Sequence, residues 1–390
     1  MLTETESQER VLRLQKMLQS KEIHAALFIL PIDVYYFAGT RQNAILWIPA
    51  DGQPMLLVRK SIMRAREESP IADIRPFPSS KEFASVFSED HSCIGMTFDA
   101  VPVQQHTYYT RALPGRRFVD ISMMLRELRS VKSLFELEQL RLSAGKLASV
   151  LAEVPHFLKA GMRELDLSAE LEYRLRKAGH EGYIRMRAFN QELFYGIAAS
   201  SGGLNGGFFD GPVTGKGLSS ASPHGASYDA IQANQPVLID YPGVFNGYIA
   251  DMTRMFVIGT IDPELQRAFD VAIDIQEMVR QEMKPGVICE ELFLAAASMA
   301  EQAELGSCFM GMPGEQAKFI GHGVGLELDE LPVLAKGFTM PLQLRQVIAV
   351  EPKFVIPGKG VIGIENTFVV TAEGGLRLSD LPDAIVSLEA

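Results

Sequence analysis

Hydrophobic positions in the first third of the chain alternate between helical spacing and short apolar runs. In SQERVLRLQKMLQSKEI, which starts at Ser7, the apolar residues recur at the three- and four-residue intervals of a helix face. Apolar runs follow at AALFIL and VYYFAG, and AILWIPADGQPMLLV predicts two strands around a turn at Asp51 and Gly52. Because this alternation continues to RRFVDIS, we expect an α/β unit of about 125 residues, an ordinary domain size.

The next segment predicts a long helix that opens a second domain. In VKSLFELEQLRLSAGKLASVL, which starts at Val131, Ser133 and Glu136 have the spacing of a capping box. Leucine and alanine residues then recur along one helix face. We therefore place the domain boundary just before this helix and expect domains at residues 1–130 and 131–390.

The second domain contains a faint internal repeat. Residues 158–179 and 283–306 each contain a lysine, a glycine turn and a helical pattern that ends at glycine. Strand-rich sequence with acidic or histidine residues follows each copy. Two related halves that face each other would bring those residues to one cleft, although any turn and helix produce a similar pattern by chance.

Composition narrows the class of protein. Among the 390 residues, 47% are hydrophobic, which is enough for a large core, and the formal net charge of −11 argues against nucleic-acid and anionic-membrane partners. The three cysteines are far apart and form no disulfide or CxxC pattern. The N-terminus is polar, and no apolar run reaches about 18 residues, so neither a signal peptide nor a membrane span is expected. These features predict a cytoplasmic protein.

Two strand-like segments carry one aspartate each. VLID ends at Asp240, and GYIADMTRMFVI contains Asp251 among the β-branched and aromatic residues typical of strands. A buried carboxylate is costly unless a cation or hydrogen-bond donors compensate for it. For these two acids alone, capping by backbone N–H groups or by Arg254 is a sufficient explanation.

Three further residues favour a shared ligand. Glu351 and Glu365 each follow an apolar strand-like run, and His322 lies in a glycine-rich turn, where the backbone can approach a ligand closely. Four carboxylates within a few ångströms repel each other, and two divalent cations would balance their charge. The alternative is that arginines and amides satisfy the same acids, in which case no metal ion is needed.

Such a set of ligands points to metal-assisted hydrolysis. Several carboxylates with one imidazole suit Mn²⁺, Co²⁺, Fe²⁺ or Zn²⁺, and the excess of oxygen favours Mn²⁺. Two ions about 3.5–4 Å apart can share a bridging water and polarise a carbonyl group. The expected reaction is the hydrolysis of an amide-like bond.

These segments resemble those of the pita-bread metallohydrolases, which include prolidase, Xaa-Pro aminopeptidase and the metal-free creatinase. IDYPGVFNGYIADMTR is similar to the family's hairpin with two aspartates, and GHGVGLELDELP is similar to its G-H-G-V-G-L-x-x-H-E-x-P turn. VEPKFVIPGKGVIGIEN resembles a pair of strands that begins with E-P-G and ends with R-I-E-D, and SSASPHGASYDA resembles the segment with the P-H histidine. DVYYFAG and VKSLFELEQLR resemble the N-terminal domain and linker of the prolidase branch.

The resemblance implies a fold of the mixed α/β (α+β) class with two domains. A creatinase-like N-terminal α/β domain precedes a pita-bread catalytic domain with pseudo-twofold halves. It also implies a homodimer and two divalent metal ions, with five ligands that would be Asp240, Asp251, His322, Glu351 and Glu365.

The same resemblance implies a role for each of these residues. Asp251 and Glu365 would bridge the two ions, Asp240 would bind one ion, and His322 and Glu351 would complete the other.

Two further roles come from the family. Glu351 would take the proton from the attacking water, and His224 would contact the substrate or the tetrahedral intermediate. Without the motif, His224 is an ordinary loop histidine. The Gly/Ser-rich loop before it, with Phe208 and Phe209, is expected to form a wall of the substrate pocket.

The chain departs from the family pattern close to these ligands. Asp329 stands where the family has its second histidine, Gly363 where it has an arginine, and Asn366 where it has an aspartate. An ionised aspartate cannot donate a hydrogen bond. Asp329 would either pair with a positive charge on the substrate or be a solvated loop acid.

These observations predict a dinuclear metallohydrolase that cleaves the amide bond on the N-terminal side of proline in a small peptide. One alternative keeps the fold and the metals but acts on a non-peptide small molecule, as the changes at Asp329 and Gly363 suggest. Another is a binding homologue that has lost catalysis.

Overall fold

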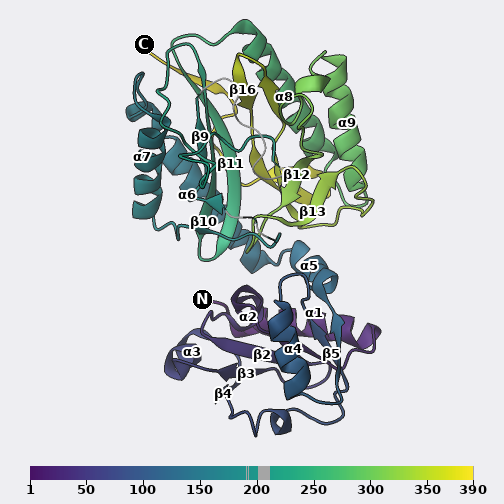
Figure 1. Cartoon of the computed structure of the whole chain (residues 1–390). Helices are drawn as coiled ribbons and strands as arrows, with labels where there is room; N and C mark the ends of the chain where they lie inside the picture. Colours follow the sequence, from purple (N-terminus) through teal and green to yellow (C-terminus); the bar gives the residue numbers. More distant parts are fainter. Residues whose placement is uncertain (190, 192, 201–210, 390) are drawn as a thin grey trace. The chain divides into compact units, whose positions relative to one another are not determined.

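The computed structural model describes residues 1–189, 191, 193–200 and 211–389. The chain forms two compact units, residues 1–129 and 130–390 (Figure 1). The first unit has a single sheet, the second has several, and each unit has its own packed interior.

The first unit is built on a mixed sheet with strand order β4-β3-β2-β1-β5-β6. Its strands are β1 Ala25–Phe28, β2 Ala44–Pro49, β3 Met55–Val58, β4 Asp73–Pro76, β5 Cys93–Met96 and β6 Arg117–Asp120. Its helices are α1 Glu4–Ser20, α2 Pro31–Ala38, α3 Ile62–Glu68, η1 Ala84–Val86, α4 Val103–Ala112 and α5 Ser122–Ser130. The predicted helix at the N-terminus and the predicted hairpin, β2 and β3, are confirmed. The apolar run VYYFAG lies in α2, which ends where Gly39 adopts a φ of +67°.

The second unit contains the strands that carry the predicted ligands. Its helices are α6 Leu134–Leu151, η2 Val154–His156, α7 Glu164–Lys177, α8 Pro263–Glu282, α9 Cys289–Gln302 and η3 Gly306–Cys308. Its strands are β7 Tyr183–Ile184, β8 Leu193–Phe194, β9 Ile197–Ala199, β10 Pro236–Phe245, β11 Tyr248–Ile258, β12 Phe319–Gly323, β13 Glu330–Ala335, β14 Val347–Val350, β15 Lys353–Ile356, β16 Gly360–Gly363, β17 Asn366–Thr371, β18 Gly374–Arg377 and β19 Ile385–Leu388.

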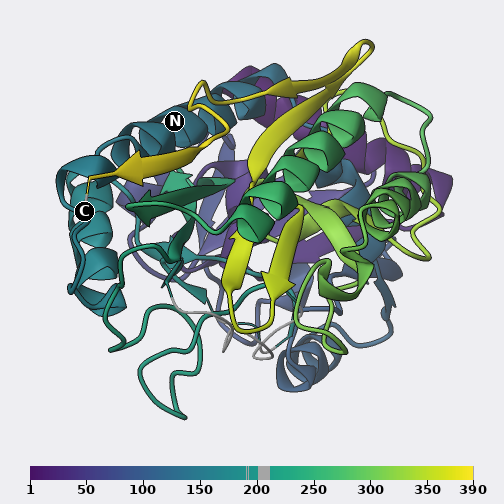
Figure 2. The same ribbon diagram turned by 90° about the horizontal axis from the view of Figure 1, so that it is seen from above.

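Two larger sheets organise this unit. One has the order β19-β11-β10-β9 and the other β13-β12-β14-β17-β18, while β15 pairs with β16. Figures 1 and 2 show α7, in teal, on the side of the first sheet, and α8 and α9, in green, beside the yellow strands of the second half. Each sheet thus has helices of its own half beside it.

The predicted capping box at the start of α6 is confirmed. The backbone N–H of Glu136 donates to the Ser133 hydroxyl at 3.1 Å, and the backbone N–H of Ser133 donates to the Glu136 carboxylate at 3.1 Å. The two segments of the predicted repeat also share a local fold. α7 and α9 each follow a turn in which a glycine, Gly161 or Gly286, has a positive φ of 83° or 93°.

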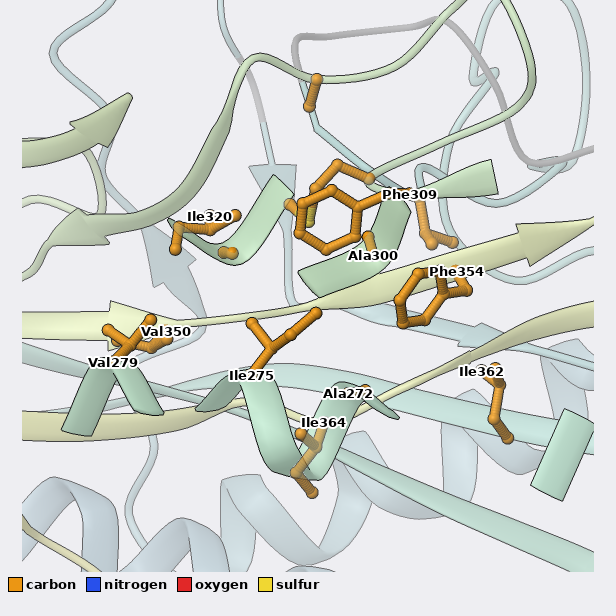
Figure 3. Packing of buried hydrophobic residues seen from close by; sticks show 14 of the residues in the cluster. Ala272, Ile275, Val279, Ala300, Phe309, Ile320, Val350, Phe354, Ile362 and Ile364 are labelled. Atoms are coloured by element: carbon orange, nitrogen blue, oxygen red, sulfur yellow. The ribbon is translucent and has the colours of Figure 1, made fainter. Parts of the chain in front are cut away.

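A large apolar cluster fixes the strands of the second half against α8. Ile275 and Val279 of α8 are fully buried and lie with Val350, Phe354 and Ile364 in one packed group (Figure 3). Val350 and Ile364 immediately precede polar residues of the candidate site in the chain, and Phe354 immediately follows one. Burial of such side chains contributes about 1.5–3 kcal/mol each, so the backbone around the site is held rigidly. Within the described ranges, no helix is long and apolar enough to cross a membrane.

Candidate active site

The hairpin of β10 and β11 places its two aspartates on one face. In the antiparallel register, Asp240 lies opposite Thr253, and Asp251 lies opposite Pro242. Residues two apart on a strand point to the same face. Asp240 and Asp251 are therefore diagonal neighbours on one side of the hairpin, close enough for their side chains to meet.

The second half repeats this diagonal arrangement. His322 of β12 lies opposite Ala349 of β14, and the backbone N–H of Glu351 donates to the carbonyl of Ile320 at 2.9 Å. By the same alternation of side chains, His322 and Glu351 lie diagonally on one face. Each half of the unit thus contributes one diagonal pair of polar residues.

Glu365 connects the two halves. Its backbone pairs with Thr253 in an isolated antiparallel bridge, and its Oε2 accepts a hydrogen bond from the Thr253 hydroxyl at 2.9 Å. Since Thr253 lies opposite Asp240, this bridge brings Glu365 to the aspartate pair.

The structure brings all five predicted ligand residues together. Ligand atoms of Asp251, His322 and Glu365 lie within 4.8 Å of one another, and so do those of Asp240, Glu351 and Glu365. Nε2 of His322 is 3.5 Å from a Glu351 oxygen and 3.9 Å from Oε1 of Glu365. Glu365 is 1% exposed, and its Oε1 has no hydrogen-bond partner in the described part of the chain. This buried oxygen lies beside the histidine and fits a bound cation.

A sixth residue, Lys353, which was not among the predicted site residues, also belongs to the cluster. Its side chain is 1% exposed, and its Nζ donates to Asp240 at 2.9 Å, to Glu351 at 2.7 Å and to Glu365 at 3.0 Å. The signal was present in the VEPKF segment. Lys353 stands where the family pattern has the glycine of E-P-G, and strand alternation places it on the same side as Glu351.

Gly363 makes room for this lysine. The two residues are cross-strand partners in the hairpin of β15 and β16. A Cβ atom at Gly363 would lie 2.6 Å from Cγ of Lys353 and 2.6 Å from the carbonyl oxygen of Pro352. Relative to the family pattern, the long cationic residue has moved from one strand of the hairpin to the other.

The electrostatics reflect one cation among four acids. Burial raises the pKa of Asp240 to about 6, against the lowering effect of Lys353. Burial also raises the pKa of Asp251 well above its usual range, and the nearby Glu365 and Asp240 raise it further. Burial alone would lower the pKa of Lys353, but Asp240 and the two glutamates hold it well above its usual range. The cluster has an excess of negative charge that the single ammonium does not balance.

Arg254 does not cap the aspartates. It lies 1% exposed beside them in sequence, but its guanidinium donates to the backbone carbonyl of Glu365 at 3.0 Å and to the side chain of Asn366 at 2.8 Å. It also pairs with Asp383 at 3.2 Å. The alternative in which Arg254 neutralises Asp240 or Asp251 is therefore wrong, and Asn366 acts as an acceptor for Arg254.

Two backbone N–H groups donate to the side chain of Asp329. Its Oδ1 accepts from the backbone N–H of Arg187 at 2.7 Å, and its Oδ2 accepts from that of Ala188 at 2.7 Å. These two bonds tie the carboxylate to the backbone, so Asp329 is not a freely solvated loop acid. Its pairing with a positive charge on the substrate stays a prediction, because each oxygen can accept a further hydrogen bond. The residue anchors the loop that follows β7.

His224 lies in the connection between β9 and β10 and is half-buried. Gly217 has a φ of +72°, and a Cβ atom there would lie 2.6 Å from the backbone nitrogen of His224, so this loop folds tightly on itself. Phe208 and Phe209, expected in the pocket wall, lie outside the described residues.

Comparison with known proteins gives the family. The sequence profile of metallopeptidase family M24 matches residues 138–372. The chain belongs to metallopeptidase family M24. The profile of the creatinase/prolidase N-terminal domain matches residues 10–131. The chain is thus an M24 metallopeptidase with a creatinase-like N-terminal domain and a mixed α/β architecture. The pita-bread fold and the family of metal-dependent hydrolases that its motifs indicated are confirmed.

Individual relatives are similar to this chain along nearly its full length. The chain is 26% identical over 378 residues to the Xaa-Pro dipeptidase of Pyrococcus furiosus, covering 95% of this chain and 97% of that protein. Its fold is similar to an X-Pro aminopeptidase from Thermotoga maritima, with a TM-score of 0.79 at 24% identity over 97% and 99% of the two chains. It is also similar to an Xaa-Pro dipeptidase from Bacillus anthracis, with a TM-score of 0.82 at 23% identity over 98% and 100%.

The family implies divalent metal ions, and the residues fit one ion better than two. Asp251, His322 and Glu365 offer two carboxylates and an imidazole around the unpartnered Oε1 of Glu365, which is a donor set suited to Mn²⁺, Fe²⁺, Co²⁺ or Zn²⁺. Around Asp240, Glu351 and Glu365, the ammonium of Lys353 already contacts all three acids. A second ion does not fit this position while the lysine is there.

Proposed function

We propose that this chain is a metal-dependent hydrolase that cleaves the amide bond on the N-terminal side of proline in small Xaa-Pro peptides. The observation that carries the proposal is the buried cluster of five donors from two facing halves, with Oε1 of Glu365 left for a cation beside His322. The 26% identical Xaa-Pro dipeptidase, similar from end to end, supports the choice of substrate.

Each residue of the cluster has a role in this proposal. Asp251, His322 and Glu365 would hold a divalent ion, which would polarise the scissile carbonyl and acidify a water molecule. Glu351 is the proposed base. One of its oxygens is held by Lys353 at 2.7 Å, and the other faces His322 at 3.5 Å, so the carboxylate is fixed at the edge of the proposed ion position. A base must lie within hydrogen-bond reach of the proton that it takes.

The remaining assignments are carried by the motif. His224 is proposed to contact the substrate, and Mn²⁺ is the proposed ion because oxygen donors dominate the cluster. A homodimer in the cytoplasm stays a prediction from the sequence and its resemblance.

The test is a panel of Xaa-Pro dipeptides and longer peptides, assayed with the Mn²⁺-loaded protein and with the chelated protein. Hydrolysis that needs the metal supports the proposal. Glu351→Gln is expected to lower kcat by about 10²–10⁴-fold, the usual contribution of a general base. Glu277→Gln is the control, because Glu277 on α8 is half-exposed and pairs with Arg280 at 2.6 Å. A Glu351→Gln variant with full activity would remove Glu351 from the mechanism.

A second candidate is hydrolysis of a non-peptide amide or a similar small molecule by the same cluster. The specific observation is that Asp329, in the place of a family histidine, accepts two backbone N–H bonds as a carboxylate, which has no donor to offer a substrate. A metal-loaded protein that binds its ion but leaves every Xaa-Pro peptide intact would favour this candidate. A folded protein that binds no metal would favour a homologue without catalysis.

A further inference from the structure

We propose that the ammonium group of Lys353 permanently takes the place of one metal ion, so that this chain binds a single divalent ion where the pita-bread pattern implies two. This inference rests on the proposed function, because the remaining ion is the one on which the proposed hydrolase depends. It concerns the number and position of the ions rather than the reaction.

The geometry of the ammonium group is that of a cation with a complete set of ligands. Nζ of Lys353 has three N–H donors, and the three acids that it contacts at 2.7–3.0 Å come from three different strands or strand ends. These are ordinary lengths for charge-assisted hydrogen bonds. Each N–H of the ammonium group therefore has a carboxylate acceptor, one from each of the three acids.

The same position is the one that a second ion would need. Asp240, Glu351 and Glu365 form one of the two groups of acids close enough to bind an ion. A transition-metal ion lies about 2.0–2.2 Å from its carboxylate oxygens. An ion that contacted these three acids would lie between the same oxygens as Nζ and would overlap it.

Burial of the lysine side chain opposes its displacement from the three acids. Its side chain is 1% exposed, and the neighbouring residue Phe354 is fully buried in the apolar cluster beside α8. Displacement of the ammonium by an ion would move a charge away from three acids into an apolar interior, which is costly. The space for the lysine is also built in, because Gly363 opposite it lacks the side chain that would collide with Cγ.

What remains after Lys353 is a site for one ion. Oε1 of Glu365, which has no hydrogen-bond partner in the described ranges, lies 3.9 Å from Nε2 of His322, and Asp251 completes the group. The ammonium and one divalent ion together bring three positive charges to four carboxylates. The ion is therefore expected on the His322 side and the ammonium on the Asp240 side.

The test is the metal content of the full chain. The protein is stripped with chelator, equilibrated with Mn²⁺, freed of excess ion by gel filtration and analysed by mass spectrometry of the metal. We expect about one Mn²⁺ per chain for the unaltered protein and about two for Lys353→Gly, which opens the position between the three acids. Lys359→Met is the matched control, because Lys359 lies in the turn of the same hairpin but is part-exposed and pairs with Asp262 and Glu264. This variant should keep about one ion.

Each result is decisive. Two ions in the unaltered protein would overturn the role of Lys353 and leave the proposed hydrolase standing. No ion in the folded protein would overturn both proposals. A single ion in Lys353→Gly would show that the lysine does not exclude the second ion. Lys353→Ala, which removes the ammonium but leaves a more ordinary backbone, replaces the glycine variant if that variant does not fold, and the count for the unaltered protein stands in either case.

Discussion

Two buried lysines in the second unit differ in how completely they and other groups of the chain satisfy the acids that they contact. Lys132 and Lys353 are each 1% exposed. Nζ of Lys132 bonds Oε2 of Glu330 at 2.6 Å, and the other oxygen of Glu330 accepts from the backbone N–H groups of Leu326 and Glu327 at 2.8 and 3.2 Å. Both oxygens of that carboxylate are therefore occupied by groups of the chain.

The cluster around Lys353 is not closed in this way. One ammonium faces three of the four acids, and a buried oxygen of Glu365 has no hydrogen-bond partner among the described residues. In the Lys132–Glu330 pair the two charges balance and every carboxylate oxygen accepts a hydrogen bond. In the cluster around Lys353 the acids outnumber the cation, and one buried oxygen accepts no hydrogen bond from the described residues. This difference separates a buried acid that holds the fold from a buried acid that holds an ion.

The largest expected effect tests the closed pair. Lys132→Met leaves the Glu330 carboxylate buried without its cation, and the loss of one partner of a buried ion pair costs about 3–5 kcal/mol. Denaturant unfolding at pH 7 measures the change. A loss below about 1 kcal/mol would mean that the pair does not support the fold, and the contrast with Lys353 would weaken.

The next effect tests the open cluster. Glu365→Gln removes the charge from the oxygen that faces His322, so bound Mn²⁺ and turnover should both fall, turnover by at least about 100-fold, because even residues that only orient a metal ligand contribute 10–100-fold. Metal analysis and initial rates measure the two changes together. Unchanged metal content would show that the unpartnered oxygen does not bind the ion.

Asp329 provides a smaller test, because both of its oxygens accept hydrogen bonds from the backbone. Asp329→Ala removes two hydrogen bonds to the backbone at Arg187 and Ala188, and we expect a loss of about 1–3 kcal/mol in the free energy of unfolding. Asp329→Asn keeps one acceptor oxygen and should lose less. Equal stability of all three proteins would leave the anchoring role without support.

His180 extends the comparison to a buried side chain whose two ring nitrogens both form hydrogen bonds while the imidazole is neutral. Its Nδ1 accepts from the backbone N–H of Gly182 at 2.9 Å, so Nε2 carries the proton and donates to the carbonyl of Pro242 at 3.0 Å. Burial lowers the pKa of His180 below its usual value of 6.5.

The direction of the pH effect follows from this lowered pKa. Because the unfolded chain binds the proton more readily than the folded chain, the contribution of His180 to stability is present above pH 6.5 and is lost as the pH falls through the folded-state pKa. Urea unfolding between pH 7.5 and pH 5 should show a loss that His180→Gln reduces. An identical pH profile for the variant would contradict the assignment.

Local signals predicted much of the fold and most of the site. The Ser133 capping box is visible in four residues and forms as expected. The five donor residues were identified because acids in apolar strands are unusual and because the motifs give their spacing. The diagonal pairing of Asp240 with Asp251 could follow only from the register of the hairpin, which no local signal fixes.

Two features depended on contacts that the sequence does not display. Lys353 follows Glu351 by two residues, so the alternation of a strand placed it on the same face, but a lysine after a strand is ordinarily solvated. The structure shows that it is 1% exposed, in the hairpin of β15 and β16. Asp329 binds backbone groups of Arg187 and Ala188, more than a hundred residues away in the chain, and a backbone donor has no sequence signature.

The anomalous scattering of crystals grown with Mn²⁺ would locate the ions and the lysine together. If Lys353 replaces one ion, the map has a single peak bounded by Asp251, His322 and Glu365, with the Lys353 ammonium beside it between Asp240 and Glu351. Two peaks, with the lysine side chain displaced from the acids, would contradict this replacement.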